Sequence, residues 1–406
     1  MVRSAFANTM LGFGLAVALF AAPADAQAHL NLLYLFKGGA DGLSPSSGLV
    51  FDKQGNLYGT TAAGGGIGCG GFGCGTVFKL TPDGTETLLY SFQGGTNDGY
   101  DPNSLIRDSD GNFYGTTLYG GNAGNGGCNN GSCGVVFKLA PDGTETVLHA
   151  FSGGDDGANP DGGMVRDKAG NLYGTAENGG TTDRGIVFRI APDGTETILH
   201  EFCVQNCDDG QGPMGNLISD KAGNLYGTTG GGGNGSNGGT VYRLAKDGTL
   251  TVLYTFCAQG GQCGWLPEAG VIMDSAGNLY GTTYAGGTGD CPPTSGCGTV
   301  FELSPDGTET ELHSFDPSVD GELPVAGVIM DKAGNLYGAV GGSAAPKCRG
   351  KPGVVFRLTP QGKETIYCIP SGVAAGVIER GGAFYGAGTG QGTYKHAAGF
   401  IFQLKN

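Results

Sequence analysis

Short runs of Val, Leu, Phe, Tyr and Thr recur along the chain and are separated by turn residues. In the first group these runs cover 48–52, 56–61, 76–80 and 85–92. Runs of this length, rich in β-branched and aromatic residues and bounded by Gly, Pro and Asp, are typical of β-strands. After residue 26 no stretch shows sustained helical periodicity. The pattern therefore predicts an all-β protein.

Two tight turns join these runs. Asp52 to Gly55 connects the first run to the second, and Pro82 to Gly84 connects the third to the fourth. Proline presets the first turn dihedral and glycine accepts a positive φ, so each sequence predicts a hairpin. Each group of four runs is thus expected to form one antiparallel sheet, with strands A, B, C and D.

A Gly-Asn-Leu-Tyr-Gly core marks each group, and it recurs at nearly regular intervals. The steps between successive core tyrosines are 56, 59, 53, 54, 57 and 48 residues, so seven units share a period near 54. Radial stacking of four-stranded units with this count and period predicts a seven-bladed β-propeller. The core tyrosines are Tyr58, Tyr114, Tyr173, Tyr226, Tyr280, Tyr337 and, in a degraded copy, Tyr385.

The two ends of the chain hold complementary parts of one unit. The first strand after residue 26, at 32–36, resembles a D strand, and the chain ends on a C-type strand at 400–404. The last blade would then take its outer strand from the N-terminus, which closes the ring and covers the sheet edges. We expect residues 27–406 to form this single domain.

Composition and charge narrow the function classes. The chain of 406 residues contains 84 Gly, yet 39% of its residues are hydrophobic and 15% are charged, which suits a packed core rather than a disordered tail. Its net charge of -15 repels nucleic acid and anionic lipid at long range. We therefore expect no nucleic-acid partner, and nothing in the pattern calls for a cofactor.

The N-terminus has the features of a secretory signal peptide. Arg3 precedes an apolar run at 11–22, and Ala24, Asp25 and Ala26 form an Ala-x-Ala exit. Such a run is short for a bilayer span. We expect cleavage of residues 1–26, secretion to the periplasm or the medium, no membrane association afterwards, and a monomer.

Twelve cysteines agree with export, because an even number in an oxidising compartment usually forms disulfides. Five couples are separated by only three to five residues, so each bridge would fix the shape of one loop. Zinc ligation and free thiols are the alternatives; the five histidines are not spaced to complete a structural zinc site. The expected pairs are Cys69 with Cys74, Cys128 with Cys133, Cys203 with Cys207, Cys257 with Cys263, Cys291 with Cys297, and Cys348 with Cys368.

The repeat unit itself resembles a known family. It reads Asp-x-x-Gly-Asn-Leu-Tyr-Gly-Thr-Thr, then Gly-Gly, then Gly-Thr-Val-Phe-Lys-Leu-x-Pro-Asp-Gly-Thr-Glu-Thr. This pattern is similar to the GloVer (Gloeo-Verruco) tandem repeat of exported bacterial proteins, which is related in pattern to NHL-type and streptogramin-lyase-type propellers. The resemblance implies a propeller and export but no settled activity, substrate or catalytic residue. Many members carry a C-terminal surface anchor; none follows Lys405 here, so we expect release.

The alternating strand directions place the A–B and C–D hairpins on one face and the longer B–C and D–A loops on the other, which we call the long-loop face. Function collects on loops over a rigid scaffold, so this is the candidate working face. An Asp-Gly-x-x-Pro motif recurs in its D–A loops, and five acidic positions at one level could bind a cation or a basic ligand. In the structural alternative, each carboxylate turns back on its own loop. The aspartates are Asp41, Asp98, Asp156, Asp209 and Asp320.

Departures from the repeat are more informative than the repeat. The fifth D–A loop replaces Asp-Gly with Cys263 and Gly264 and adds Trp265, the only tryptophan. A tryptophan on a disulfide-held loop is a candidate platform for a sugar ring. Burial against the neighbouring loop is the alternative.

Basic residues gather in the B–C loops of the sixth and seventh units and would suit a carboxylate-bearing ligand such as a uronate. Beside them, Tyr394 or His396 could abstract a proton in an elimination. Solvated loop charge is the alternative. The basic residues of this group are Lys347, Arg349, Lys351, Lys395 and His396.

The other histidines argue against catalysis. His149, His200 and His313 occupy the D-strand position that Tyr34, Tyr90 and Tyr254 fill in other units, so we interpret them as packing variants.

Three functions remain open. The leading hypothesis is an exported binding module that presents its long-loop face to a glycan or protein ligand. A second is a lyase or hydrolase of acidic polysaccharide at the same face, and a third is a structural surface protein.

Overall fold

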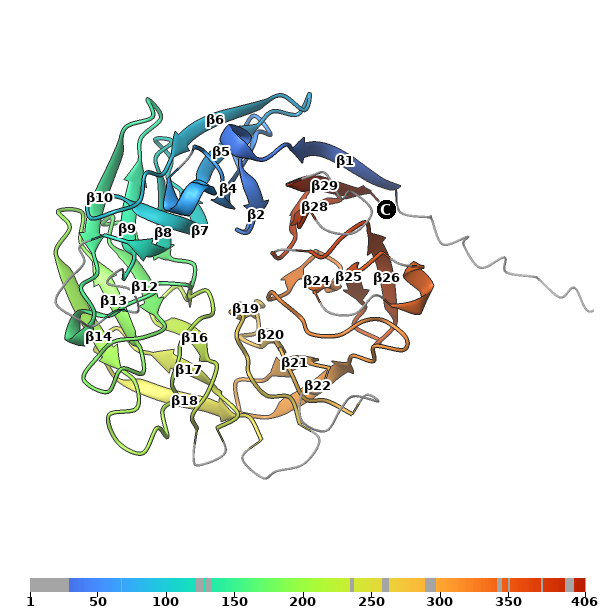
Figure 1. Ribbon diagram of the computed structural model, residues 1–406. Helices are drawn as coiled ribbons and strands as arrows, with labels where there is room; N and C mark the ends of the chain where they lie inside the picture. The colour runs from blue at the N-terminus through green and yellow to red at the C-terminus, as the bar shows by residue number, and fades with distance from the viewer. Residues whose placement is uncertain are drawn as a thin grey trace, which may run out of the picture.

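The structure, a computed structural model, describes residues 29–66, 68–121, 128, 133–233, 237–257, 263–288, 297–341, 345–349, 351–373, 375–390 and 398–405. In these segments the chain forms β-strands and short 3-10 turns. The strands make seven antiparallel sheets arranged in a ring around a central opening (Figure 1). The seven-bladed β-propeller predicted from the repeat is confirmed.

The first four blades follow one another along the chain. Blade 1 contains β2 (Leu43–Pro45), β3 (Val50–Phe51), β4 (Leu57–Ala63), β5 (Thr76–Leu80) and β6 (Glu86–Ser91). Blade 2 contains β7 (Gly99–Arg107), β8 (Phe113–Gly120), β9 (Val135–Leu139) and β10 (Glu145–Ala150). Blade 3 contains β11 (Val165–Arg166), β12 (Leu172–Ala176), β13 (Ile186–Ile190) and β14 (Glu196–Glu201). Blade 4 contains β15 (Ile218–Ser219), β16 (Leu225–Thr229), β17 (Thr240–Leu244) and β18 (Leu250–Thr255).

The other blades complete the ring. Blade 5 contains β19 (Ile272–Met273), β20 (Leu279–Thr283), β21 (Thr299–Leu303) and β22 (Glu309–Ser314). Blade 6 contains β23 (Ile329–Met330), β24 (Leu336–Val340), β25 (Gly353–Leu358) and β26 (Glu364–Ile369). Blade 7 contains β27 (Ile378–Arg380), β28 (Ala383–Gly388), β29 (Gly399–Lys405) and β1 (His29–Phe36). Short 3-10 turns are η1 (Gly39–Asp41), η2 (Cys69–Gly71), η4 (Gly154–Asp156) and η5 (Pro346–Cys348).

The ring closes where the two ends of the propeller meet. Strand β1 pairs antiparallel with β29, with Leu32 opposite Phe402 and Leu35 opposite Phe400. The predicted closure is therefore confirmed, and both strands are longer than predicted. Arg380 of blade 7 reaches into blade 1, where its Nη1 donates to the Asp52 carbonyl at 2.5 Å and its guanidinium lies over the Phe51 ring.

The inner strand of blade 1 is shorter than its sequence pattern predicted. The run at 48–52 forms only the two-residue β3, and residues Leu43–Pro45 pair separately with β4. Pro45 has no N–H to donate, and Ser44 before it has a φ of 56°, so the chain leaves the ladder between the two strands. Within that gap, the Ser47 hydroxyl accepts a hydrogen bond from the Thr60 N–H at 3.0 Å, in place of a backbone partner.

The Asp-x-x-Gly-Asn-Leu-Tyr sequence clamps the hairpin between strands A and B. In blade 1, Asp52 Oδ1 accepts the Asn56 N–H at 2.9 Å, and Asp52 Oδ2 accepts the Asn56 side-chain amide at 2.6 Å and the Tyr58 hydroxyl at 3.0 Å. These hydrogen bonds provide partners for polar groups of the turn that the strand ladder does not pair. The tyrosine-to-aspartate bond recurs from Tyr114 to Asp108, Tyr173 to Asp167, Tyr226 to Asp220, Tyr280 to Asp274 and Tyr337 to Asp331.

Aromatic rings join each blade to the next. Phe36 at the end of β1 is 1% exposed and packs edge-to-face on Phe78 of β5, with ring centroids 5.1 Å apart. Edge-to-face pairs add to the stabilisation that comes from burial. Five equivalent pairs are Phe92 with Phe137, Phe151 with Phe188, Phe202 with Tyr242, Phe256 with Phe301, and Phe315 with Phe356.

Candidate functional site

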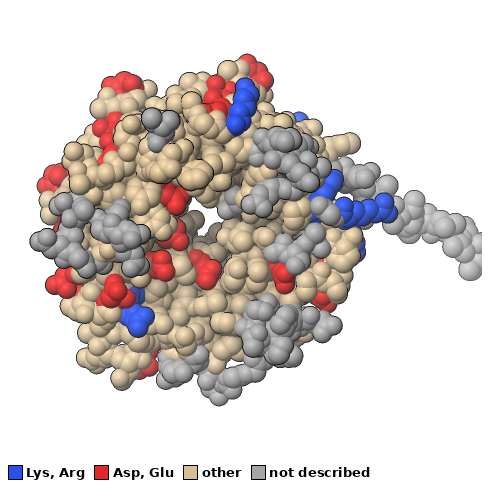
Figure 2. Space-filling view, viewed as in Figure 1, with Lys and Arg blue, Asp and Glu red and all other residues tan. Residues whose placement is uncertain are grey.

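Four carboxyl groups meet at the central opening on the long-loop face. Asp101 and Asp161 flank the motif prolines of the loops into blades 2 and 3, Glu268 follows Pro267 in the loop into blade 5, and Glu177 follows β12. The charge of Asp161 acts on the other three groups, and blades 3 and 5 are not neighbours, so these side chains approach one another across the opening. Figure 2 shows Asp and Glu gathered at the opening, on the side of blades 2 to 4.

The backbone of the D–A loops sets this arrangement. Asp101, just before Pro102, has a φ of 59°, and the equivalent residues Ser44, Asn159, Leu266 and Leu323 have a φ between 56° and 59°. A residue before proline avoids the right-handed helical region, and here a left-handed residue turns the chain towards the inner strand. The left-handed residue therefore fixes the course of each D–A loop, and the residues on either side of the motif proline differ from copy to copy.

Burial and mutual repulsion raise the pKa values of these acids. Burial, and then the charge of Asp161, raises the pKa of Asp101 to about 6. Burial raises the pKa of Asp161. The Asn103 amide donates to the Asp161 carboxylate at 3.0 Å and lowers the pKa, but by less than burial raises it. The pKa values of Glu177 and Glu268 are raised by burial and by the neighbouring carboxylates. A cationic group placed at the opening would reverse these shifts.

A cavity of about 240 Å³ opens beside these acids, between the long loops of blades 3 and 4. Its wall combines amide, carboxylate and guanidinium groups with apolar groups that include Met214 and Leu266. This combination suits a polyhydroxylated ligand, because each hydroxyl both donates and accepts. The polar side chains of the wall are Glu177, Asn178, Asp183, Arg184, Gln211 and Asn237.

Hydrogen bonds hold the amide groups of the cavity in place. Gln211 Nε2 donates to Asn237 Oδ1 at 2.9 Å, and the same oxygen accepts the Gly232 N–H at 3.0 Å. Asn178 Nδ2 donates to Asn159 Oδ1 at 3.2 Å. Each amide has more donor and acceptor positions than these bonds use. These hydrogen bonds therefore fix the orientation of the amide side chains in the wall.

Sequence reasoning missed this cavity, although the sequence carried a signal for it. Glu177 and Asn178 occupy positions that hold Ala62 and Ala63 in the first unit and Gly230 and Gly231 in the fourth. They depart from the repeat, which is the criterion that singled out Trp265. What the sequence did not reveal is that Gln211, in the next blade, faces them.

Trp265 occupies the position of Gln211 one blade further on. Its backbone pairs with Ala285 just as Gln211 pairs with Gly231, and its half-buried side chain lies against Gly286, where a Cβ would come within 2.7 Å of the indole Cδ1. The adjacent Leu266 lines the cavity. The Trp265 indole itself lies against the B–C loop of blade 5.

The basic group predicted in blades 6 and 7 is described only in part. Lys347 and Arg349 are exposed in and after η5, a turn held by the disulfide between Cys348 and Cys368. Lys351 is also exposed. Tyr394, Lys395 and His396 lie outside the described residues, so their placement beside the blade 6 residues stays a prediction.

The five motif aspartates bind the outer strand of the preceding blade. In each, the carboxylate accepts a backbone N–H of its own loop and contacts the D-strand Tyr or His; Asp41, for example, accepts the Tyr34 hydroxyl at 2.5 Å and the Lys37 N–H at 2.6 Å. The corresponding ring contacts are Tyr90 with Asp98, His149 with Asp156, His200 with Asp209, and His313 with Asp320. The three histidines also pack edge-to-face on Phe151, Phe202 and Phe315.

A glutamate of the next blade completes most of these contacts. Glu86, Glu145, Glu196 and Glu364, each at the start of a D strand, lie near the motif aspartate of the preceding blade contact. Burial and the Asp98 charge raise the pKa of Glu145 to about 7, and burial and Asp156 raise that of Glu196 to about 9. Burial disfavours the Asp156 carboxylate, but hydrogen bonds from His149, Glu196 and Ser152 outweigh it and lower its pKa to about 2. Glu196 therefore holds the proton of this carboxyl pair.

Five of the six predicted cysteine pairs are disulfides in the structure. Cys291 lies outside the described residues, so its pairing with Cys297 is not described. Disulfides of this number favour an exported protein. In the described part of the chain, we find no helix with the length and apolar character needed to cross a membrane.

Comparison with protein families identifies the family of this chain. The profile of the Gloeobacter/Verrucomicrobia repeat matches residues 19–207 and 127–345. The chain belongs to this repeat family. The resemblance seen in the repeat unit is thus confirmed, and no curated protein matches the chain in sequence.

Solved structures with the same fold are distant in sequence. The extracellular domain of a protein described as a hybrid two-component system from B. thetaiotaomicron has 12% identity and a TM-score of 0.56, covering 92% of this chain and 42% of that one. A gluconolactonase from Xanthomonas campestris has 13% identity and a TM-score of 0.44, covering 93% and 89%. A luciferin-regenerating enzyme has 13% identity and a TM-score of 0.43, covering 93% and 95%. At this identity the likeness shows the fold alone.

Proposed function

We propose that this protein is an exported binding module whose long-loop face binds a carbohydrate in the cavity between blades 3 and 4. The observation that carries the proposal is the convergence of Asn178, Gln211 and Asn237 with Glu177 and Arg184 on one cavity of about 240 Å³. Amide and carboxylate groups that are fixed in advance bind sugar hydroxyls with little loss of side-chain entropy. Met214 and Leu266 supply an apolar surface for the face of a sugar ring.

The charges near the cavity favour some classes of carbohydrate over others. Asp101, Asp161 and Glu268 lie at the opening beside the cavity, and the whole chain has a net charge of -15. A uronate would meet this field unfavourably, whereas a neutral or amino sugar would not. We therefore favour a sugar with an ammonium group that faces the opening, and Trp265 as a contact for a second sugar unit.

The test is calorimetric titration with three matched oligosaccharides: oligomers of glucosamine, oligomers of N-acetylglucosamine and oligogalacturonate. The expected order of affinity is glucosamine oligomers first and oligogalacturonate last, with a stronger salt dependence for the charged ligand. Gln211→Ala and Asn237→Ala should each weaken binding about tenfold, since each removes one hydrogen-bonding group.

Lys246→Ala is the matched control, because Lys246 is exposed at the C–D hairpin of blade 4, on the opposite face. It should leave the affinity unchanged. Equal affinities of the wild type and both cavity variants would refute the site. Tighter binding of oligogalacturonate would instead indicate that the basic residues of blade 6 form the binding site.

An enzyme at the same cavity is the second candidate, and Glu177 favours it. A half-buried carboxyl with a raised pKa in a cavity wall has the property that a general acid needs. Release of shorter oligomers during the titration, abolished in Glu177→Gln with binding retained, would identify a hydrolase. Oligomers that stay intact after prolonged incubation would favour the binding module over the hydrolase.

A further inference from the structure

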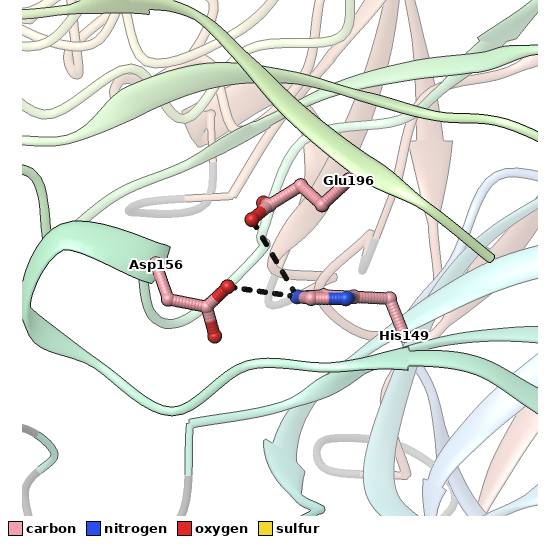
Figure 3. Close-up of side chains that lie close together, drawn as sticks. All are labelled: His149, Asp156 and Glu196. Atoms are coloured by element: carbon pink, nitrogen blue, oxygen red, sulfur yellow. Dashed lines mark hydrogen bonds and ion pairs between the residues drawn. The ribbon is translucent and has the colours of Figure 1, made fainter.

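Three metal-ligating side chains meet at the outer rim between blades 2 and 3. His149 comes from β10, Asp156 from η4 and Glu196 from the start of β14. His149 Nε2 lies 3.1 Å from Asp156 Oδ1 and 3.8 Å from Glu196 Oε2. Figure 3 shows both carboxyl groups directed at the same imidazole nitrogen. We call this group the first rim cluster.

The same arrangement recurs between blades 5 and 6, in what we call the second rim cluster. His313 Nε2 lies 2.9 Å from Asp320 Oδ2 and 3.5 Å from Glu364 Oε1. In each cluster one ligand atom from each residue lies within 4.8 Å of the others. Two copies of one arrangement arise because the same two repeat positions hold His and Glu.

The separations match those around a small transition-metal ion. Zinc binds imidazole nitrogen and carboxylate oxygen at about 2.0–2.2 Å, so two ligand atoms of a tetrahedral site lie roughly 3.3–3.6 Å apart. The four separations, from 2.9 to 3.8 Å, span that range, and the two shortest are the hydrogen bonds between imidazole and aspartate. One imidazole with two carboxylates suits a borderline ion such as Zn²⁺ and leaves one position for water.

Burial and access also fit an ion. The side chains of the first rim cluster are 12% to 25% exposed, which an ion can reach from solvent. Glu196 Oε1 is buried and has no hydrogen-bond partner among the described residues, which is also true of Glu86 Oε1 and Glu145 Oε1 at the contacts that have tyrosine in place of histidine. A buried carboxyl oxygen without a partner is unfavourable, and a metal ion beside it would remove that cost.

We propose that each rim cluster binds one divalent transition-metal ion of the zinc type, which cross-links the outer strands of two adjacent blades. The ion joins a histidine and an aspartate of one blade to a glutamate of the next, and therefore stabilises the contact between the blades.

The other blade contacts serve as natural comparisons within the same chain. Tyr34 and Tyr90 replace the histidine beside Glu86 and Glu145, and a protonated phenol is a poor ligand. At the contact between blades 3 and 4, His200 and Asp209 are present, but Leu250 stands where the other blades have glutamate. The proposal therefore predicts two bound ions rather than three.

The experiment is a titration of the untagged, oxidised full chain with ZnCl₂ at pH 7.5 after treatment with EDTA. Calorimetry should give close to two equivalents. Glu196→Leu and Glu364→Leu should each remove one, and the double variant should bind none. Because leucine occupies the equivalent position 250 naturally, these variants are expected to fold.

A gain of binding makes the test stricter. Leu250→Glu should complete a cluster with His200 and Asp209 and raise the stoichiometry to about three. Cobalt(II) should show the d–d absorption of a low-coordinate site in the wild type and lose it in the double variant. Zinc binding that persists unchanged in the double variant, or no binding at micromolar zinc, would overturn the proposal.

Discussion

The Tyr58 hydroxyl donates a hydrogen bond to the Asp52 carboxylate at 3.0 Å, across the hairpin that the repeat motif builds. The same pair of residues forms the same bond in six blades. Blade 7 has no aspartate at this position; there the Gly382 N–H donates to Glu379 at 2.7 Å. The motif is therefore a local clamp that each blade carries for itself.

Removing the clamp should destabilise the protein in proportion to the hydrogen bonds lost. In blade 4, Asp220 accepts the Asn224 N–H, the Asn224 amide and the Tyr226 hydroxyl. Asp220→Ala should lower the free energy of unfolding by about 2 kcal/mol, and Tyr226→Phe by about 1 kcal/mol. Urea denaturation measures both, and Lys221→Ala, at an exposed position of the same turn, is the control. Equal losses in all three variants would contradict a role for these hydrogen bonds.

Stability should fall as the pH rises from about 4.5 towards 9. Burial, together with the neighbouring aspartates, raises the pKa of Glu86, Glu145 and Glu364 to about 7 and that of Glu196 to about 9, against 4.5 in the unfolded chain. The folded state then binds more protons than the unfolded chain, so this stability is complete below pH 4.5 and is lost as the pH passes through 7 to 9. His313, whose pKa is raised by Asp320 and Glu364 despite its burial, acts in the same direction.

Urea midpoints at pH 5, 7 and 9, measured with EDTA present, check this dependence. The variant with all four glutamates changed to glutamine should show a flatter profile between pH 5 and 9, because its amides keep the hydrogen-bonding shape of the protonated acid without titrating. A wild-type midpoint that rises from pH 5 to 9 would show that the glutamates are ionised in the folded state.

Closure of the ring should depend on the anchor of β1. Phe36 is 1% exposed and packs on Phe78, whereas its neighbour Leu35 is 40% exposed. Phe36→Ala should cost about 3–5 kcal/mol by leaving a cavity between blades 7 and 1. Leu35→Ala should cost roughly 0.5 kcal/mol or less. Similar midpoints for the two variants in thermal denaturation would argue against docking of β1.

The disulfides should differ in their contribution to stability. Cys348 and Cys368 are 20 residues apart and join η5 to β26, whereas Cys257 and Cys263 are 6 apart. On the chain-entropy account, loss of the longer bridge costs about 3 kcal/mol and loss of the shorter one about 2 kcal/mol. Cys348 is also buried, so its pair of alanine substitutions should show the larger effect in urea. Peptide mapping of the non-reduced protein verifies each pairing.

Much of the fold followed from the sequence, while the sites followed only in part. The interval between Tyr58 and the later core tyrosines gave the blade count, and the D-type strand at the N-terminus gave the closure. Trp265 was singled out because it breaks the repeat, and its chain neighbour Leu266 lines the cavity. Gln211, which lines the cavity itself, was overlooked because nothing in its own unit shows that it faces Glu177.

The sequence by itself determined the blades, because hairpins, strand periodicity and the Asp52–Tyr58 clamp all involve residues close together in the chain. Only the tertiary structure decided which residues of different blades meet: Asp161 with Glu268 across the opening, Gln211 with Asn178 in the cavity, and His149 with Glu196 at the rim. Those meetings depend on the twist of each sheet and on the angle between blades, which are set by packing around the whole ring and leave no periodic mark on the chain.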